Sequence, residues 1–242
     1  MQPGVKIFDT PGILAESFAK DFSERLNVNS EKKDKINIAL SGGSSPKLFF
    51  KVLAEKYKDK IDWQKINFYW ADERCVPPGD PESNYGMTKG FLLDHIPVPS
   101  QNVHRVKGED EPAKESDRYS KEISDNVNFK NSYPSFDIIL LGIGEDGHTA
   151  SIFPNVIQLI YSKKITEVSE HPVTGQKRIT LTGTVINNSS YIAFLVSGSS
   201  KAKVVSQVIN KNPESINYPA AKVFPAGGLP DWYLDKDAAG LI

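Results

Sequence analysis

The amino-acid sequence predicts an α/β fold, in which a single doubly wound, mostly parallel sheet carries helices on both faces in a Rossmann-like arrangement. Short runs of apolar or β-branched residues recur along the chain and are separated by longer stretches of mixed character. Two of the longer stretches place apolar residues at helical spacing, as amphipathic helices do. Two of the short runs lead directly into glycine-rich loops. We expect one domain that covers residues 1–242.

Six strands are expected from the short runs. The run at residues 136–141 is almost continuously apolar, which is typical of a strand that is buried on both faces. We therefore expect it near the centre of the sheet. The expected strands, in chain order, are Val5–Phe8, Ile36–Leu40, Ile66–Trp70, 136–141, 178–182 and 191–196.

Helices are expected at residues 11–26 and 46–57, where apolar residues recur every three or four positions. We expect Ser44 or Ser45 to be the N-cap of the second helix. Pro46 then stands near the first helical position, where the missing N–H has no intrahelical partner to lose. Polar stretches rich in turn formers are expected to be surface loops, and they lie at residues 77–83, 108–116 and 210–217.

Charge and cysteine content limit the partners and the compartment of the protein. The 29 Lys and Arg residues stand against 30 Asp and Glu residues, which gives a net charge of −1. Binding to nucleic acid or to an anionic membrane is therefore not expected, and an anionic ligand needs a local basic pocket. The lone Cys75 allows no internal disulfide, and residues 1–6 lack the apolar run of a secretory signal. These features favour a cytoplasmic protein.

The first glycine-rich loop joins the expected strand Ile36–Leu40 to the second helix. Its residues are Ser41, Gly42, Gly43, Ser44 and Ser45. Free N–H groups at a helix N-terminus and serine hydroxyls can surround a phosphate, and glycine lets the backbone approach it closely. A tight turn with one capping serine is the alternative interpretation. Two glycines and three serines exceed what such a cap needs, so this composition favours the interpretation as a ligand-binding loop.

Asp72, Glu73 and Arg74 follow the expected strand Ile66–Trp70. Ligands of doubly wound sheets bind outside the carboxyl ends of the strands, so these residues are candidates for binding. The planar guanidinium of Arg74 suits a phosphate or a developing alkoxide, while the two carboxylates can orient it or bind sugar hydroxyls. A surface ion-pair group is the alternative interpretation.

The second glycine-rich loop follows the run at residues 136–141, and its first six residues match the dinucleotide fingerprint G-x-G-x-x-G. That fingerprint requires a long helix after the glycines, whereas Pro154 stands within two turns of the last one. The match therefore does not predict nicotinamide binding.

The same loop places Asp146 two residues before His148. A carboxylate that accepts a hydrogen bond from one imidazole nitrogen fixes the tautomer and leaves the other nitrogen free to take a proton from water. A loop histidine with one structural hydrogen bond is the alternative interpretation. No second His or Cys stands at ligand spacing, so we expect no metal.

In their joint order and spacing, these motifs resemble the 6-phosphogluconolactonases, within the larger group that also contains the glucosamine-6-phosphate deaminases. The matching segments read SGGSSP at 41–46, DERCVP at 72–77, SNY at 83–85, LGIGEDGHTASIFP at 141–154, RITLT at 178–182 and GSSKA at 198–202. The lactonases carry His-Thr-Ala-Ser followed by Phe-Pro, as at residues 148–154, whereas the deaminases carry His-Ile-Ala-Phe-Asn-Glu-Pro. The chain departs from the usual pattern in having Ser45 for threonine and Asn155 for a frequent glycine.

The resemblance implies hydrolysis of 6-phospho-D-glucono-1,5-lactone to 6-phospho-D-gluconate in the oxidative pentose phosphate pathway, without a cofactor. It makes His148 the general base, Asp146 its orienting partner, and Arg74 a charge stabiliser near the reacting carbonyl or a phosphate contact. The backbone of the first glycine-rich loop, Arg178 and Lys201 are then expected to bind the phosphate. Two alternatives remain, a deaminase-type isomerase that uses Asp72 as a base and a sugar-phosphate sensor without catalysis.

Overall fold

The computed structural model describes residues 4–242 and is built around a six-stranded sheet in which all neighbouring strands are parallel. The strand order is β1-β11-β10-β7-β2-β3. Their bounds are β1 Val5–Phe8, β2 Ile36–Leu40, β3 Ile66–Trp70, β7 Ile138–Leu141, β10 Ile192–Val196 and β11 Asp231–Asp235. The predicted fold class, a mostly parallel α/β sheet, is confirmed.

The direction of strand addition reverses between β2 and β7. From β2 the chain passes through a helix to β3 at one edge, and the next strand of this sheet, β7, lies on the other side of β2. Strands β10 and β11 then continue away from β3, toward β1 at the far edge. In open α/β sheets such a switch point leaves a crevice at the carboxyl ends of the strands, where ligands bind.

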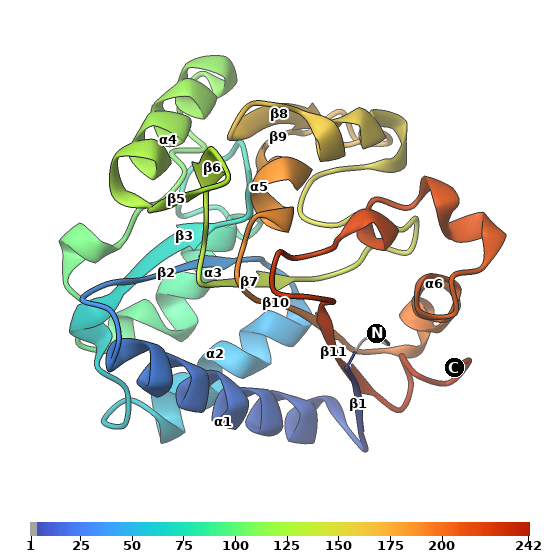
Figure 1. Ribbon diagram of the computed structural model, residues 1–242, viewed down its shortest axis with the longest axis horizontal. Coiled ribbons are helices and arrows are strands. Elements are labelled where there is room, and N and C mark those ends of the chain that lie inside the picture. The colour runs from blue at the N-terminus through green and yellow to red at the C-terminus, as the bar shows by residue number, and fades with distance from the viewer. Residues whose placement is uncertain (1–3) are drawn as a thin grey trace.

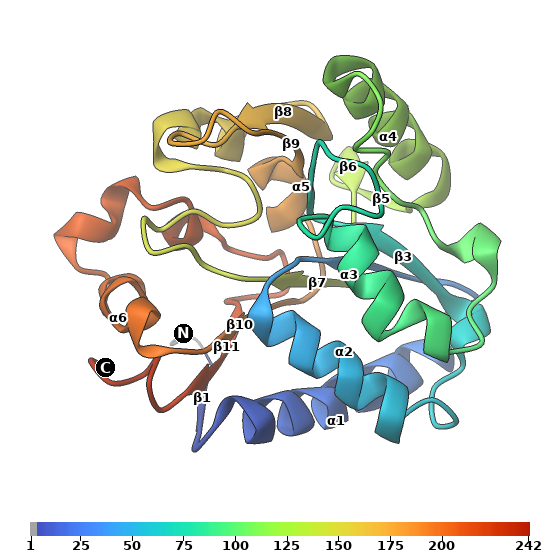
Figure 2. The ribbon, with the colours of Figure 1, turned by 180° about the vertical axis from the view of Figure 1, so that it is seen from behind.

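Two layers cover the sheet (Figure 1). Helices α1 (Pro11–Ser30) and α2 (Ser44–Lys56) lie on one side. The other side carries α4 (Pro112–Asn126), α5 (Gly183–Asn187) and a small antiparallel sheet in the order β4-β9-β8. The strands of that sheet are β4 Asp72–Arg74, β8 Thr166–Glu170 and β9 Lys177–Leu181. Figure 2 shows the same two layers from behind.

The remaining elements lie at the margins of these layers. Helix α3 (Asn84–Phe91) packs against α2, and the short hairpin of β5 (Phe129–Lys130) and β6 (Tyr133–Pro134) precedes β7. Helix α6 (Ala202–Ile209) follows β10. Short 3-10 helices occur at Trp63–Lys65, Leu93–His95, Ser100–Asn102, Pro154–Tyr161, Ser199–Lys201, Pro213–Asn217 and Pro219–Lys222. No helix within residues 4–242 is both long and apolar enough to cross a membrane.

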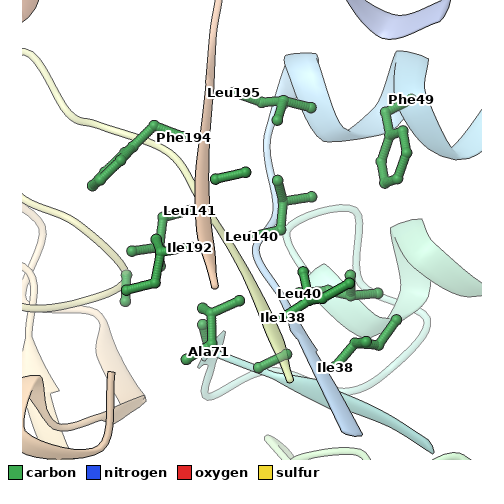
Figure 3. Close-up of a cluster of buried hydrophobic side chains, with 14 of the residues drawn as sticks. Ile38, Leu40, Phe49, Ala71, Ile138, Leu140, Leu141, Ile192, Phe194 and Leu195 are labelled. Atoms are coloured by element: carbon green, nitrogen blue, oxygen red, sulfur yellow. The ribbon is translucent and has the colours of Figure 1, made fainter. Parts of the chain in front are cut away.

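The central strands are buried on both faces, so their side chains form two apolar layers. Figure 3 shows Leu140 and Leu195 on the side of α2, with Phe49 of that helix, while Leu141 and Phe194 point to the opposite side. This alternation follows from the period of two residues along a strand. It explains why the β7 segment is almost continuously apolar in sequence, as expected for a central strand.

Several boundaries and placements differ from the sequence-based expectations. The strand expected at residues 178–182 exists as β9, but it lies in the small antiparallel sheet. Strand β11 was not expected, and α4 begins at Pro112, inside the expected loop at 108–116. Gly43 occupies the N-cap of α2, so the expectation of a capping serine was wrong. The first three residues of the stretch examined for a secretory signal, 1–3, lie outside the described residues.

Candidate active site

A cavity of about 280 Å³ lies at the carboxyl ends of the parallel strands, beside the switch point between β2 and β7. Its wall is formed by three loops, which follow β2, β7 and β10, and by side chains of β4, β9 and the first turn of α3. The loops are distant in sequence and meet here because parallel strands end at the same edge of the sheet. Of the predicted site residues, those lining the cavity are Ser41, Gly42, Gly43, Ser44, Ser45, Asp72, Arg74, His148, Arg178 and Lys201.

The loop after β2 presents hydrogen-bonding groups that the protein itself leaves free. Gly43 has a φ of 115°, which a residue with a side chain rarely adopts, and no side chain caps the N-terminus of α2. The Ser41 hydroxyl is buried and has no hydrogen-bond partner among the described residues. A buried polar group without a partner is costly, so these groups favour a polar ligand in the cavity.

Two contacts fix this loop in place. Gly42 packs so closely on Asn84 that a Cβ atom would lie 1.8 Å from the Asn84 Oδ1 atom. The Ser45 and Ser197 hydroxyl oxygens are 2.7 Å apart, which ties the loop to the end of β10. Asn84 and Ser197 both line the cavity and were not among the predicted site residues. Ser197 directly follows a strand of the parallel sheet, so the rule that sites lie at carboxyl ends was the available signal.

Arg74 and Arg178 lie directly opposite each other on the antiparallel strands β4 and β9. The Nε atom of each is buried without a hydrogen-bond partner, and neither guanidinium has a carboxylate within 4.0 Å in the described part of the chain. Burial, and then the charge of Arg74, lowers the pKa of Arg178. Like charges in directly opposite positions repel each other. An anion between the two side chains would relieve this repulsion.

Lys201 adds a third positive charge to the cavity. It ends the 3-10 helix Ser199–Lys201 after β10, and its Nζ atom is 3.9 Å from a carboxylate oxygen of Glu145, which is itself largely exposed. Such a partly exposed, long contact contributes little to stability. Lys201 is therefore available to a ligand.

His148 and Asp146 form the hydrogen bond predicted from sequence, with 2.6 Å between His148 Nδ1 and Asp146 Oδ1. Burial raises the pKa of Asp146, but the hydrogen bond and the charge of His148 outweigh this, so the net shift is downward. An ionised Asp146 accepts the proton of Nδ1 and leaves Nε2 of a neutral imidazole without a proton. The arrangement suits a general base at the cavity wall.

Glycines allow the tight path of the loop that carries this pair. A Cβ atom on Gly144 would lie 2.1 Å from His148 Nδ1. Gly147 has a φ of 84°, and a Cβ atom there would lie 2.3 Å from the Tyr218 ring. Ala150 also has a positive φ, 49°, which is uncommon for a residue other than glycine. No α-helix follows these glycines, since the next helical segment is the 3-10 helix Pro154–Tyr161. The loop therefore differs from a dinucleotide-binding turn in the way expected.

The two acidic residues of the β4 segment have different surroundings. Asp72 lines the cavity, and its Oδ2 atom accepts a hydrogen bond of 2.6 Å from the Ser151 hydroxyl. Glu73 does not line the cavity, contrary to the expectation that it binds substrate, and is buried on the opposite side of β4. Successive side chains of a strand point to opposite faces, so Asp72 and Arg74 face the cavity while Glu73 faces away.

Comparison with known proteins identifies relatives over the whole length of the chain. The family described as glucosamine-6-phosphate isomerases/6-phosphogluconolactonase matches residues 9–232. A 6-phosphogluconolactonase of Aggregatibacter actinomycetemcomitans is 40% identical over 236 residues, which cover 97% of this chain and 98% of the relative. The crystal structure of devB protein matches with a TM-score of 0.92 and 40% identity over 100% of both chains. A 6-phosphogluconolactonase from Thermotoga maritima matches with a TM-score of 0.85 and 27% identity over 97% of this chain and 100% of that one.

Proposed function

The chain belongs to the glucosamine-6-phosphate isomerase/6-phosphogluconolactonase family, and from this membership and the site we infer that it hydrolyses 6-phospho-D-glucono-1,5-lactone to 6-phospho-D-gluconate. It is an enzyme, a carboxylic ester hydrolase that acts on a lactone in the oxidative pentose phosphate pathway. The observation that carries the proposal is the hydrogen bond between Asp146 and His148, because the His148 side chain lines a cavity that also contains three cationic side chains.

His148 is the general base of the proposed reaction. Its Nε2 atom accepts a proton from water as the water oxygen bonds to the lactone carbonyl carbon, C1. The resulting alkoxide collapses, the bond between C1 and the ring oxygen breaks, and the ring oxygen takes the proton back from His148. Asp146 keeps the imidazole in the required tautomer and stabilises the transient imidazolium. Such base catalysis typically contributes about 10²–10⁴-fold to a rate.

The phosphate is bound by the backbone N–H groups of residues 42–44, by Lys201 and by the two arginines. The pairing of Arg74 with Arg178 across β4 and β9 supports a phosphate contact for Arg74 over a contact with the alkoxide. A phosphate dianion neutralises two guanidinium groups at once, and guanidinium forks bind it in bidentate fashion. Ser41, Ser45 and Asp72 are the candidates for hydrogen bonds to the substrate.

The proposal also covers the cofactor requirement, the compartment and the partners of the enzyme. Water, one base and a cationic pocket supply what lactone hydrolysis needs, so we propose that no metal or cofactor takes part. We place the enzyme in the cytoplasm, with a small sugar phosphate as its partner and without nucleic acid or membrane. The net charge of −1 supports the absence of nucleic acid and membrane, and three cationic side chains in the cavity supply the local charge that a sugar phosphate needs.

A coupled assay tests the proposal. Glucose-6-phosphate dehydrogenase generates the lactone, and the loss of lactone is followed with and without this protein at micromolar concentration. We expect loss that is much faster than spontaneous hydrolysis, and no acceleration would refute the proposal. Ammonia release from glucosamine 6-phosphate in a parallel sample would indicate the deaminase activity. Binding of 6-phosphogluconate without hydrolysis of the lactone would indicate a sensor.

A further inference from the structure

Glu73 is a buried acidic residue that the proposed reaction does not use. This residue of β4 is 1% exposed, and its carboxylate lies at the N-terminus of α3. No charged side-chain nitrogen of a described Lys or Arg lies within 4.0 Å of its carboxylate, whose hydrogen-bond donors are backbone N–H groups and one hydroxyl. Burial raises the pKa of this group to about 7, although the hydrogen bonds oppose the shift. Placing a carboxyl group here is therefore costly, which favours a specific role.

The Glu73 carboxylate accepts four hydrogen bonds from two segments. Oε1 accepts from the backbone N–H of Arg74 and from that of Asn84, both at 2.8 Å. Oε2 accepts from the backbone N–H of Tyr85 at 2.7 Å and from the Ser83 hydroxyl at 3.2 Å. One side chain thus joins β4 to the first turn of α3, whose N–H groups would otherwise lack partners.

Two of the residues held in this way have side chains at the cavity. Arg74 is one of the paired arginines, and Asn84 packs against Gly42 of the loop after β2. The Asn84 amide also donates to the backbone oxygen of Asp72 at 2.8 Å, which closes a second link between α3 and β4. A displacement of α3 relative to β4 would move the arginine and the glycine-rich loop apart. The geometry of the anion site therefore depends on Glu73.

We propose that Glu73 is a positioning residue, which sets the affinity for the substrate phosphate by fixing Arg74 and Asn84 relative to each other. Its side chain does not line the cavity, and its hydrogen bonds go to residues 74 and 83–85 and not to the His148 loop, so it acts on binding and not on proton transfer. The inference rests on the proposed function for the identity of the ligand, while the contacts that carry it are independent of catalysis. Hydrogen-bonding partners that orient metal ligands change affinity by about 10–100-fold when they are replaced, and for a residue that orients phosphate ligands we expect an effect at the lower end of this range.

The variant Glu73→Gln tests the proposal because it keeps the shape of the side chain. One carboxylate oxygen becomes an NH₂ group, which faces N–H donors and cannot accept from them. We expect the Kd for 6-phosphogluconate, measured by calorimetry, and the KM for the lactone each to rise about 10-fold, with kcat within about threefold. A Kd within twofold of the wild type would overturn the proposal.

Asp137→Asn is the matched control. Asp137 is also a buried carboxylate that accepts from a backbone N–H, that of Asn37 at 2.8 Å, but it precedes β7 at the amino end of the sheet. Its replacement is expected to lower Tm and to leave Kd and KM unchanged. A rise in Kd in this control equal to that of Glu73→Gln would show that general destabilisation, and not positioning, weakens binding, and would also overturn the proposal.

Ser83→Ala is a milder variant for the case in which Glu73→Gln does not fold. It removes one of the four donors, and we expect the Kd to rise about threefold; an unchanged Kd would count against the proposal.

The failure of the positioning role and the failure of the proposed function can be told apart in these experiments. A wild type that does not hydrolyse lactone, with weaker 6-phosphogluconate binding in Glu73→Gln, would refute the function alone. Normal hydrolysis with unaltered binding in the variants would refute the positioning role alone.

Discussion

The two glycine-rich loops at the switch point both follow a strand of the parallel sheet, but they differ in whether their hydrogen-bonding groups have partners within the protein. The loop after β2 leads into α2 and leaves its helix N-terminus without a side-chain cap and the Ser41 hydroxyl without a partner. The loop after β7 satisfies its own groups. His148 is bonded to Asp146, and the Thr149 hydroxyl donates to the backbone oxygen of Gly142 at 2.9 Å.

This difference matches two different tasks. A binding loop must offer free donors, because groups that are already bonded within the protein gain little from a ligand. A catalytic base must instead be held in one tautomer and one orientation before the substrate arrives. The first loop is therefore the phosphate-binding half of the proposed site, and the second is its catalytic half.

Replacement of His148 by Ala is the strongest test of this division. We expect kcat to fall by about 10³-fold with little change in KM, because the base is lost while the phosphate contacts remain. The matched control is His104→Ala, since His104 forms a similar pair with Glu122, at 2.8 Å, away from the cavity. That variant is expected to keep its kcat. Unchanged turnover in His148→Ala would exclude the proposed base.

Asp146→Asn tests the orientation of His148, because it changes the orienting partner and keeps the base. An asparagine keeps the shape but allows the imidazole to be held in the wrong tautomer, so we expect kcat to fall by about 10–100-fold. Glu145→Gln is the control, because this neighbouring carboxylate is largely exposed and makes only a long contact to Lys201. Its kcat is expected to remain within about twofold. Equal effects of the two variants would indicate a general loss of negative charge instead of a specific orienting contact.

Local patterns predicted the catalytic half better than the binding half. Asp146 and His148 are two residues apart in one loop, so their contact follows from neighbouring positions in the sequence. The pairing of Arg74 with Arg178 depends on the register between β4 and β9, which no local pattern specifies. The apolar and β-branched residues of 178–182 predicted a strand but not the sheet to which it belongs.

Other differences have simple physical causes. Strand β11 was not predicted, and its segment differs from the apolar strands β7 and β10 in having Asp231 and Asp235 at its two ends. The direction of the Glu73 side chain, away from the cavity, could have been predicted. If Asp72 and Arg74 face the cavity, the residue between them must face away from it.

Lys201 tests whether the loop after β10 belongs to the binding half, to which the Ser45–Ser197 contact links it. We expect Lys201→Ala to raise KM about 10-fold and to leave kcat nearly unchanged, because one phosphate contact is lost in both the ground state and the transition state. Lys203→Ala, two residues further along and exposed, is the control and is expected to behave as the wild type. A fall in kcat at constant KM would assign Lys201 to the catalytic half instead.

The smallest expected effect gives the most direct test of the difference between the loops. Ser41→Ala removes a hydroxyl that has no partner in the described structure, so we expect Tm to stay constant or to rise, while the Kd for 6-phosphogluconate rises about two- to fivefold. Thr149→Val removes a hydroxyl that is bonded to Gly142, and we expect a loss of about 1 kcal/mol in unfolding free energy, a decrease of about 2–4 °C in Tm, with Kd unchanged. Thermal unfolding and calorimetry of the two variants side by side measure both quantities. If Ser41→Ala lowered Tm and left binding intact, its hydroxyl would serve stability, and the distinction between a free binding loop and a self-satisfied catalytic loop would no longer hold.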